Sequence, residues 1–334
     1  VAALLSTLFF TTKKGLMQTG KPKLPHESPD LYLTDGGLET TLIFLEGMEL
    51  PYFAAFDLLK EEETRHHIER YYRTYLNIAK AFKTAFILES PTWRASPDWV
   101  EKLGYLRHDT VSLNKKAIAL MVSLREEYQK DIPDIIISGC IGPRGDGYRA
   151  DNRMTADVAA DYHSAQIQAF SETSVDMVSA ITINYAEEAI GITQAAHTAN
   201  LPVVISFTVE TDGKLPSGMR LQEAIEEVDK SAASKPIYYM INCAHPTHFT
   251  AELQKGMGQH WLQRIKGIRA NASCKSHAEL DESQELDRGN LQALAQANKM
   301  LRNTYQHLNV FGGCCGTDAE HILALARELT TAKV

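Results

Sequence analysis

The chain has 334 residues, of which 44% are hydrophobic and 23% charged, and its formal net charge is −8. This is the composition of an ordinary globular protein, and it excludes a fibrous repeat or a disordered chain. An acidic chain without Lys or Arg clusters gives no reason to expect a nucleic acid or a membrane surface as partner, and no run reaches the roughly 18 apolar residues of a membrane-spanning helix.

The first 30 residues are predicted to form a poorly ordered tail outside the folded domain. Their opening stretch, VAALLSTLFFTTKKG, has an apolar run, but no positive charge precedes it and no small-residue cleavage site comes before the lysine pair. A signal peptide is therefore the less favoured interpretation. Residues 31–334 are expected to form a single domain.

Eight short apolar segments, rich in β-branched residues, recur along this domain. Continuous apolar runs of four to eight residues indicate strands buried on both faces, as in a parallel sheet covered by helices. The predicted strands are LYLTDGG from Leu31, AFILES from Ala85, IIISGCIG from Ile135, DMVSAITI from Asp176, PVVISFTV from Pro202, YYMINCA from Tyr238, IKGIRANA from Ile265 and LNVFGGCC from Leu308.

The longer segments between these runs have helical periodicity, with apolar residues every three or four positions. Capping residues mark the start of two of the helices. The predicted buried faces are Ile68, Tyr72, Tyr75, Ala79 and Phe82 in one helix, Val158, Tyr162, Ala165 and Ala169 after a cap at Thr155, and Ile322, Leu323, Ala326 and Leu329 after Thr317–Asp318.

Eight strands alternating with helices over about 300 residues predict an α/β fold of the (β/α)8 type, a TIM barrel. No glycine-rich dinucleotide loop follows the first strand, which argues against two dinucleotide-binding halves. The segment Gly139–Gly147, GCIGPRGDG, lacks the GxGxxG spacing. It is interpreted as a tight turn between a strand and a helix, with a phosphate loop as the alternative.

In such a barrel, catalytic residues lie where the strands end and the following loops begin. Strands six and eight open onto the same central mouth, so Cys243 is expected to face Cys314 and Cys315 across it. Cys140 and Cys274 are interpreted as packing residues, because a free cysteine behaves as a small hydrophobic side chain. The predicted strand ends carry Asp35–Gly37, Glu89, Cys140, Asn184, Asn242–Cys243, Asn271 and Cys314–Cys315.

The adjacent cysteines Cys314 and Cys315 would point to opposite faces of a regular strand. Gly312, Gly313 and Gly316 surround them and give the backbone freedom to leave the pleat. The glycines are therefore expected to let both thiols turn toward one point.

Three thiolates with one open position form a plausible catalytic zinc site, whereas a structural zinc site takes a fourth protein ligand. His245 and His248 follow Cys243 closely and could supply that ligand, although HPTHF is favoured as a loop or the start of a helix. The five cysteines, an odd number, suit a reducing compartment, and the cytoplasm is the expected location.

The segments TDGGLET, INCAHP and FGGCCGT, in this order and separation, resemble the homocysteine S-methyltransferase family from about Leu31 to Leu329. The resemblance implies a zinc-dependent barrel in which homocysteine binds the metal through sulfur and takes a methyl group from a sulfonium or ammonium donor. Small-molecule substrates are thus the expected partners, with a homo-oligomer possible. The resemblance places Cys243, Cys314 and Cys315 at the zinc, and Asp35, Gly36 and Gly37 in the substrate-binding first loop.

The chemistry implied by the resemblance suits these residues. A thiol with a pKa near 8.5 is mostly protonated at neutral pH, and coordination to zinc converts it to the nucleophilic thiolate. Three cysteine thiolates leave the zinc site with a net charge near −1 and keep the bound acceptor sulfur electron-rich. Little acid–base machinery is required.

Substrate recognition is assigned to residues near the strand ends. Glu39 and Glu89 could hold a substrate ammonium group, or each could be a surface carboxylate or a helix cap. Trp93 could shield a cationic methyl donor through a cation–π contact, or could pack the loop. Asn242, just before a proposed zinc ligand, could orient the thiolate or the substrate without binding the metal itself.

One departure from the family concerns the amino group of the acceptor. Many relatives carry a glutamate at the end of the fourth strand that binds this group, whereas the chain has Thr182 and Asn184 there. Either Glu89 or a neighbouring carboxylate compensates, or the acceptor is a thiol other than homocysteine.

The expected donor is S-methylmethionine or S-adenosylmethionine, and a betaine-type donor is the alternative. Only Trp93 and Tyr185 are placed for the aromatic cage that betaine needs. Two further hypotheses come from other classes of protein. One is a redox protein with a Cys314–Cys315 vicinal disulfide, and the other is a zinc-stabilised binding protein with a fourth protein ligand.

Overall fold

The structure is a computed structural model and describes residues 21–231, 233–283 and 285–330. Each of the eight segments predicted as strands contains one strand. The strands are β1 Tyr32–Leu33, β2 Ala85–Glu89, β3 Ile135–Ile141, β4 Met177–Ile183, β5 Val203–Phe207, β6 Tyr238–Asn242, β7 Ile265–Ala270 and β8 Val310–Gly313.

Helices connect successive strands. Short ones follow β1: α1 Leu38–Thr40, η1 Thr41–Leu45, η2 Pro51–Phe53 and η3 Ala55–Leu59. The others are α2 Glu62–Phe82, α3 Pro97–Lys102, α4 Asp109–Tyr128, α5 Ala156–Ser171, α6 Ala186–Thr198, α7 Leu221–Ser231, α8 Pro246–Lys255, α9 His260–Gln263, α10 His277–Asp281, α11 Leu291–Thr304 and α12 Ala319–Thr330. No helix in the described ranges is long and apolar enough to cross a bilayer.

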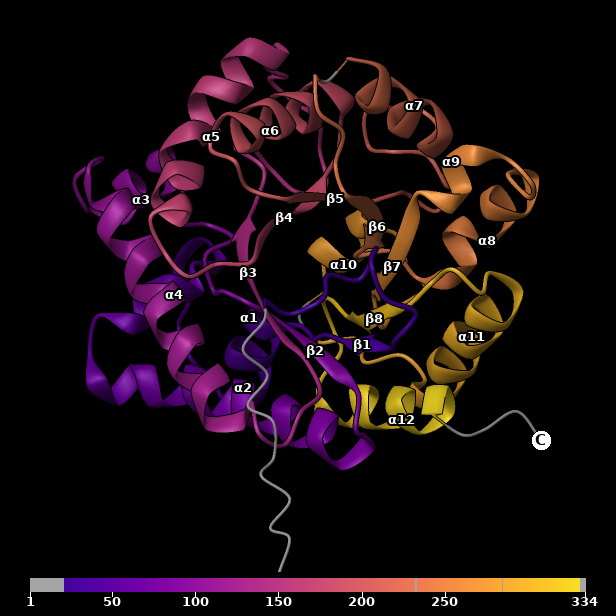
Figure 1. Ribbon diagram of the computed structural model, residues 1–334, viewed down its shortest axis with the longest axis horizontal. Coiled ribbons are helices and arrows are strands. Elements are labelled where there is room, and N and C mark those ends of the chain that lie inside the picture. Colours follow the sequence, from indigo (N-terminus) through magenta and orange to yellow (C-terminus); the bar gives the residue numbers. More distant parts are fainter. Residues whose placement is uncertain (1–20, 232, 284, 331–334) are drawn as a thin grey trace, which may run out of the picture.

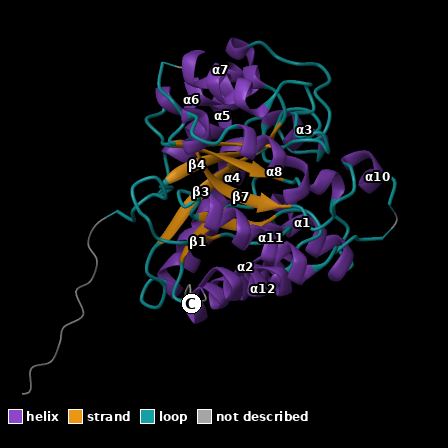
Figure 2. Ribbon diagram, turned by 90° about the vertical axis from the view of Figure 1, so that its right-hand side faces the viewer, coloured by secondary structure: helices purple, strands orange, loops and turns teal. Residues whose placement is uncertain are grey.

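The strands are parallel and close into a barrel in chain order, because β8 pairs with both β7 and β1. Figure 1 shows the helices as a ring around the strands, and Figure 2 shows the same layers from the side. The predicted (β/α)8 barrel is confirmed.

The interior of the barrel is filled by alternate residues of the strands. In β2, Ala85 and Ile87 belong to the interior cluster, whereas Phe86 and Leu88 pack in the outer core. Successive side chains of a strand point to opposite faces, so Glu89 points inward at the carboxyl end of β2. A carboxyl group thus lies just above the apolar interior.

Strand β7 places a second charged group in the same layer. Gly267 faces Met240 and Val310 of the interior cluster. Arg269 comes two residues later on the same face and is buried. The interior is therefore apolar in its middle and charged toward the carboxyl ends of the strands.

Part of the predicted tail contacts the opposite end of the barrel. Residues 1–20 lie outside the described residues. Asn309, just before β8, donates hydrogen bonds to the carbonyl oxygens of Pro25 and Ser28 at 2.9 and 2.8 Å, and the Tyr32 hydroxyl donates to the Lys23 carbonyl at 2.8 Å. Residues 23–28 thus pack on the amino ends of β1 and β8.

Three predictions about local structure were wrong. Val158 is 49% exposed, because the cap at Thr155, which does form, turns the first residues of α5 toward solvent. The glycine-rich segment is not a tight turn, since β3 ends at Ile141 and α5 begins at Ala156. Cys274 does not pack in the core, because it lies on an exposed loop.

Candidate metal centre

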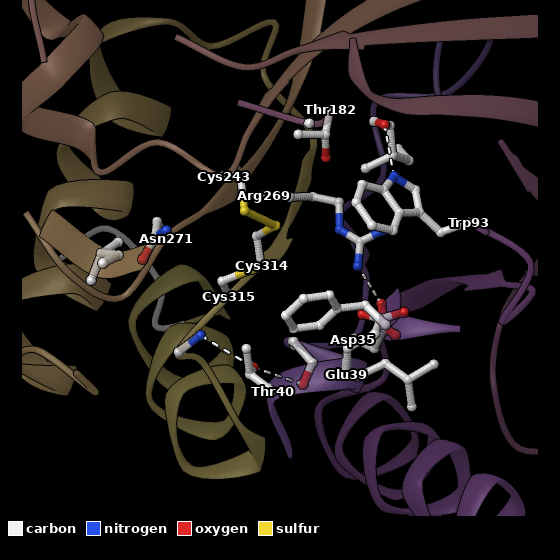
Figure 3. Close-up of a pocket in the computed structure, with 18 of the residues that line it drawn as sticks. Asp35, Glu39, Thr40, Trp93, Thr182, Cys243, Arg269, Asn271, Cys314 and Cys315 are labelled. Carbon is white, nitrogen blue, oxygen red and sulfur yellow. Dashed lines mark hydrogen bonds and ion pairs between the residues drawn. A yellow bond between two sulfur atoms is a disulfide. The ribbon is translucent and has the colours of Figure 1, made fainter. Parts of the chain in front are cut away.

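Three thiols meet at the mouth of the barrel. Cys243 directly follows β6, and Cys314 and Cys315 directly follow β8. Their Sγ atoms all lie within 4.8 Å of one another, and Cys243 is buried whereas the other two are half-buried (Figure 3). These three cysteines were predicted from the sequence to face one another, and the fold brings them together. A set of three soft sulfur donors fits a zinc ion, which prefers such ligands in a four-coordinate site.

A turn brings the two adjacent cysteines to the same side. The backbone N–H of Thr317 donates to the Cys314 carbonyl at 3.1 Å, which closes a four-residue turn immediately after β8. Gly316 occupies the third position of the turn with φ of 77°, as in a type II turn. Cys243 itself has φ of 52°, an uncommon conformation for a residue with a side chain. The regular strand conformation therefore ends before each cysteine, so the thiols need not alternate between the two faces of the sheet.

The other glycines are required for close packing. A Cβ atom at Gly313 would collide with Thr317, and one at Gly37 would lie 2.6 Å from the Cys314 carbonyl oxygen. The Gly37 N–H donates to the Thr317 carbonyl at 3.0 Å, so this amide is occupied by the protein. Of the three glycines predicted to free the backbone around the cysteines, only Gly316 has a positive φ. Gly313 is needed because a side chain there would collide with Thr317.

Two of the thiols are joined in this structure. Cys243 and Cys314 form a disulfide, with their Cα atoms 5.2 Å apart, and Cys315 lies beside it (Figure 3). The hypothesis of a Cys314–Cys315 vicinal disulfide is therefore wrong, because Cys314 pairs across the mouth. A metal ion needs both sulfurs as thiolates, so the disulfide must be reduced before a metal can bind.

A thiol count tests this pairing. Protein unfolded without reductant should give three thiols, from Cys140, Cys274 and Cys315, and five after reduction. Zinc uptake should appear only in the reduced sample, because a disulfide sulfur has no thiolate to offer. The measurement is a colorimetric thiol titration paired with metal analysis. Full zinc uptake by protein with three thiols would show that this disulfide does not block the site.

Tyr148 was not singled out from the sequence, yet it contacts the thiols. Its hydroxyl lies 3.1 Å from Cys243 Sγ and 3.4 Å from Cys315 Sγ. Its ring lies against His277 with centroids 4.1 Å apart, and His277 Nε2 is 2.7 Å from the Cys243 carbonyl oxygen. Tyr148 comes from the long β3–α5 loop, and the only signal for it was an aromatic residue within a glycine-rich segment.

We expect Tyr148→Phe to weaken zinc binding by about tenfold, because loss of a hydrogen bond to a ligand atom costs 10- to 100-fold and the ring packing stays. Competition with a chromophoric chelator measures this change. Tyr128→Phe is the matched control, since that hydroxyl contacts Asn77 on the outside of the barrel. Equal zinc affinity of the Tyr148 variant and wild type would contradict a role for this hydroxyl.

Asn242 lies behind Cys314. Its side-chain Oδ1 accepts hydrogen bonds from the Thr182 N–H at 2.9 Å and the Ser206 hydroxyl at 2.7 Å. Its Nδ2 donates to the Thr182 hydroxyl at 2.8 Å and lies 3.8 Å from Cys314 Sγ. Thr182 has the uncommon φ of 66°. Its backbone N–H and its hydroxyl both bond to the side-chain amide of Asn242, and these bonds hold the amide beside Cys314.

Asn184 and the two candidate histidines lie elsewhere. Asn184 does not line the cavity at the mouth, and its side chain donates to the carbonyl oxygens of Asp146 and Arg149 in the β3–α5 loop. His245 caps α8 by accepting a hydrogen bond from the Thr247 N–H. His248 contacts the Cys274 carbonyl oxygen. Neither histidine joins the cysteine cluster, as HPTHF at a helix start predicts.

A cavity of about 350 Å³ opens above the thiols, and its walls are acidic. The three cysteines, Gly36, Gly37 and Trp93 line it. Its carboxyl groups belong to Asp35, Glu39, Glu89, Asp146, Glu285 and Asp287, whereas its guanidinium groups belong to Arg94 and Arg269. The described walls therefore suit a ligand with positive charge.

Both guanidinium groups are engaged by the protein. Arg269 Nη2 donates to Asp35 Oδ1 at 2.5 Å, and Figure 3 shows the side chain directed at this carboxylate. Arg94 donates to two backbone carbonyl groups and lies between the Trp93 and Trp99 rings, 3.9 and 4.0 Å from their centroids. The guanidinium group of Arg94 thus covers one face of the Trp93 ring, so a cationic ligand cannot use that face.

The acidic groups of the cavity differ in their surroundings. Burial raises the pKa of Glu89 to about 7, although Arg269 lowers it, and Asp35 adds a further increase. Burial also raises the pKa of Glu39 to about 7. Both glutamates therefore change charge near neutral pH, an unusual property for two carboxyl groups in one cavity.

A (β/α)8 barrel that gathers three thiols at the carboxyl ends of its strands defines a class of enzyme that can hold a metal ion through sulfur. Residues 32–329 match the family model described as homocysteine S-methyltransferase. The chain therefore belongs to the homocysteine S-methyltransferase family and is a methyltransferase.

Known proteins agree with this assignment over most of the chain. Homocysteine S-methyltransferase 1 of Brassica oleracea var. italica is 24% identical over 332 residues, covering 89% of this chain and 93% of the relative. The homocysteine methyltransferase MmuM of Escherichia coli in its metallated form has a TM-score of 0.71 at 20% identity, covering 89% of this chain and 96% of the other. Its oxidised form has a TM-score of 0.71 at 19% identity, covering 90% and 96%. The structural likeness establishes the shared fold.

Proposed function

We propose that the protein is a zinc-dependent S-methyltransferase that moves a methyl group from a sulfonium donor to homocysteine, giving methionine. Family membership supports this function, as do the homocysteine methyltransferase names of the relatives. The observation that carries it is the cluster of Cys243, Cys314 and Cys315 at the cavity. In the described part of the chain, this cluster has no fourth ligand from His, Asp or Glu, which leaves one position for the acceptor sulfur.

Zinc bound by the three cysteines would hold the acceptor sulfur as a thiolate at neutral pH. The acceptor thiol releases its proton to solvent, and a lone pair of its sulfur forms a bond to the methyl carbon. The bond from that carbon to the donor sulfur breaks, and its electron pair neutralises the sulfonium. Asn242 and Tyr148 orient the protein thiols, and the partly apolar cavity favours the loss of charge in the transition state.

The charges of the cavity support a sulfonium donor. A sulfonium amino acid carries one more positive than negative charge, which suits acidic walls. Betaine has no net charge, because its ammonium and carboxylate groups cancel, so acidic walls attract it less than a sulfonium amino acid. We place the donor beside Glu39 and Trp93, which line the same cavity. S-methylmethionine and S-adenosylmethionine are the proposed donors.

The remaining site residues have proposed roles that follow from their contacts. Asp35 holds Arg269, while Gly36 lets the first loop approach Thr317 and Gly37 lets it approach Cys314. Asn184 supports the loop that carries Tyr148. The cytoplasm is the proposed compartment, because zinc binding requires all three thiols in reduced form.

A methyl-transfer assay tests the function. Reduced, zinc-loaded protein is incubated with homocysteine and, separately, S-methylmethionine, S-adenosylmethionine or betaine, and methionine is quantified. We expect methionine with a sulfonium donor and little with betaine. Methionine with betaine alone would overturn the donor assignment. A lack of product with every donor would overturn homocysteine as the acceptor, and other thiols would then be assayed.

A further inference from the structure

The carboxyl group of Glu89 is buried without a hydrogen-bond partner. The residue is 4% exposed and lines the cavity that contains the thiols. Neither carboxyl oxygen has a partner among the described residues. The nearby hydroxyl groups of Ser138 and Ser179 are bonded to each other at 2.7 Å, which uses one of their two protons, and both serines lower the pKa of Glu89. A buried carboxyl group with so few donors around it has acceptor capacity left for a ligand.

The guanidinium group of Arg269 is only partly used. Its Nη2 donates to Asp35 and its Nε donates to the Gly313 carbonyl at 3.2 Å. Its Nη1 has no hydrogen bond within the described ranges and makes a long ion pair of 3.9 Å with Glu89 Oε1. This distance is too great for a hydrogen bond. Arg269 therefore has an unused donor facing the unused acceptor of Glu89.

We infer that Glu89 and Arg269 form a clamp for the zwitterionic head group of the acceptor amino acid. An α-amino acid laid antiparallel across the 3.9 Å gap places its ammonium group against Glu89 and its carboxylate against Arg269 Nη1. The four charges then alternate in sign, and both unused groups gain charge-assisted hydrogen bonds. Asp35 is a positioning residue, because it fixes Arg269 from the other side.

The clamp rests on the proposed function, because it takes the acceptor to be an amino-acid thiol. It also explains how the acceptor amino group can be recognised by a chain that has Thr182 at the end of β4. The hydroxyl and N–H of Thr182 are both bonded to Asn242, so this residue supports the thiols. Recognition of the amino group moves instead to the ends of β2 and β7.

Calorimetric binding to reduced, zinc-loaded protein tests the clamp with three thiols. Homocysteine carries both charges, 4-mercaptobutanoate lacks the ammonium group and 3-mercaptopropylamine lacks the carboxylate. We expect wild type to bind homocysteine about 10- to 100-fold more tightly than either analogue, as charged hydrogen bonds suggest. Glu89→Gln should remove the preference over 4-mercaptobutanoate. Arg269→Lys, which keeps a cation beside Asp35, should reduce the preference over 3-mercaptopropylamine.

Glu172→Gln is the control, because it makes the same change at an exposed glutamate that pairs with Lys115 away from the cavity. It should keep the wild-type preference for homocysteine over 4-mercaptobutanoate. Equal binding of all three thiols by wild type would overturn the clamp while leaving thiol methylation intact. Loss of the preference in Glu172→Gln but not in Glu89→Gln would overturn it as well. Binding of no thiol at all would overturn both the clamp and the proposed function.

The clamp also predicts a pH dependence. Only the carboxylate form of Glu89 pairs with an ammonium group, and its pKa is about 7 in the free protein. The advantage of wild type over Glu89→Gln in homocysteine affinity should therefore grow between about pH 6 and pH 8. Thiol ionisation affects both proteins alike. The groups with electrostatic influence on Glu89 are Asp35, Tyr72, Cys140, Tyr238 and Arg269. An advantage that falls as pH rises would contradict the assignment.

Discussion

Replacing Cys314 with alanine should abolish zinc binding and lower methyl transfer by more than about 100-fold. The reason is the geometry of the cluster, in which three Sγ atoms lie within 4.8 Å of one another. Removing one leaves two sulfurs, too few for a catalytic site that needs three protein ligands. The loss should exceed the 10- to 100-fold effect of removing an outer-shell partner. Metal analysis and the methionine assay measure the two effects.

Cys274→Ala provides the control for this experiment. Cys274 is exposed and lies outside the cluster, so its loss should leave zinc content and rate at wild-type values. Circular dichroism of the Cys314 variant should show an intact barrel, since Cys314 lies just beyond β8. Wild-type zinc content in the Cys314 variant would contradict the assigned ligand set.

Replacing Asp35 with alanine should lower the free energy of unfolding by about 3 kcal/mol. The Asp35–Arg269 pair is buried, with the two side chains 5% and 9% exposed. Breaking a buried pair leaves an uncompensated charge and costs about 3–5 kcal/mol. We expect the lower end, because Glu89 remains 3.9 Å from the guanidinium group. Denaturant unfolding measures the change.

A double variant separates the cost of the lone charge from the cost of lost packing. Asp35→Ala with Arg269→Met removes both charges and should be more stable than Asp35→Ala alone, because an apolar replacement of a buried pair is often tolerated. A double variant whose loss equals the sum of the two single losses would show that the ion pair contributes no coupling.

The barrel could be predicted from the sequence because its strands are buried on both faces. Runs such as IIISGCIG and PVVISFTV are continuous and apolar, which strands of an amphipathic sheet are not. The strand-end rule then located the cysteines, Asp35 and Glu89 at one rim. These inferences use local patterns, so a single sequence suffices for them.

Arg269 and Tyr148 could not be assigned in the same way. Arg269 interrupts an apolar strand, and a charge in a buried strand was a signal that went unused. Its partner, Asp35, is 234 residues away, and only closure of β7 and β8 onto β1 brings the two together. Tyr148 reaches the thiols because the β3–α5 loop is long, whereas its glycines indicated a tight turn. Such contacts depend on the length of a loop and on pairing between distant strands, and local sequence patterns predict neither.

The direct test of the proposed function is to count the sulfur ligands of zinc. X-ray absorption at the zinc edge of reduced, zinc-loaded protein should show three sulfur ligands from the cysteine cluster. Addition of homocysteine should raise the number to four, because the acceptor thiol takes the open position. An unchanged coordination shell in the presence of homocysteine would contradict the proposed function and would favour a zinc-stabilised binding protein.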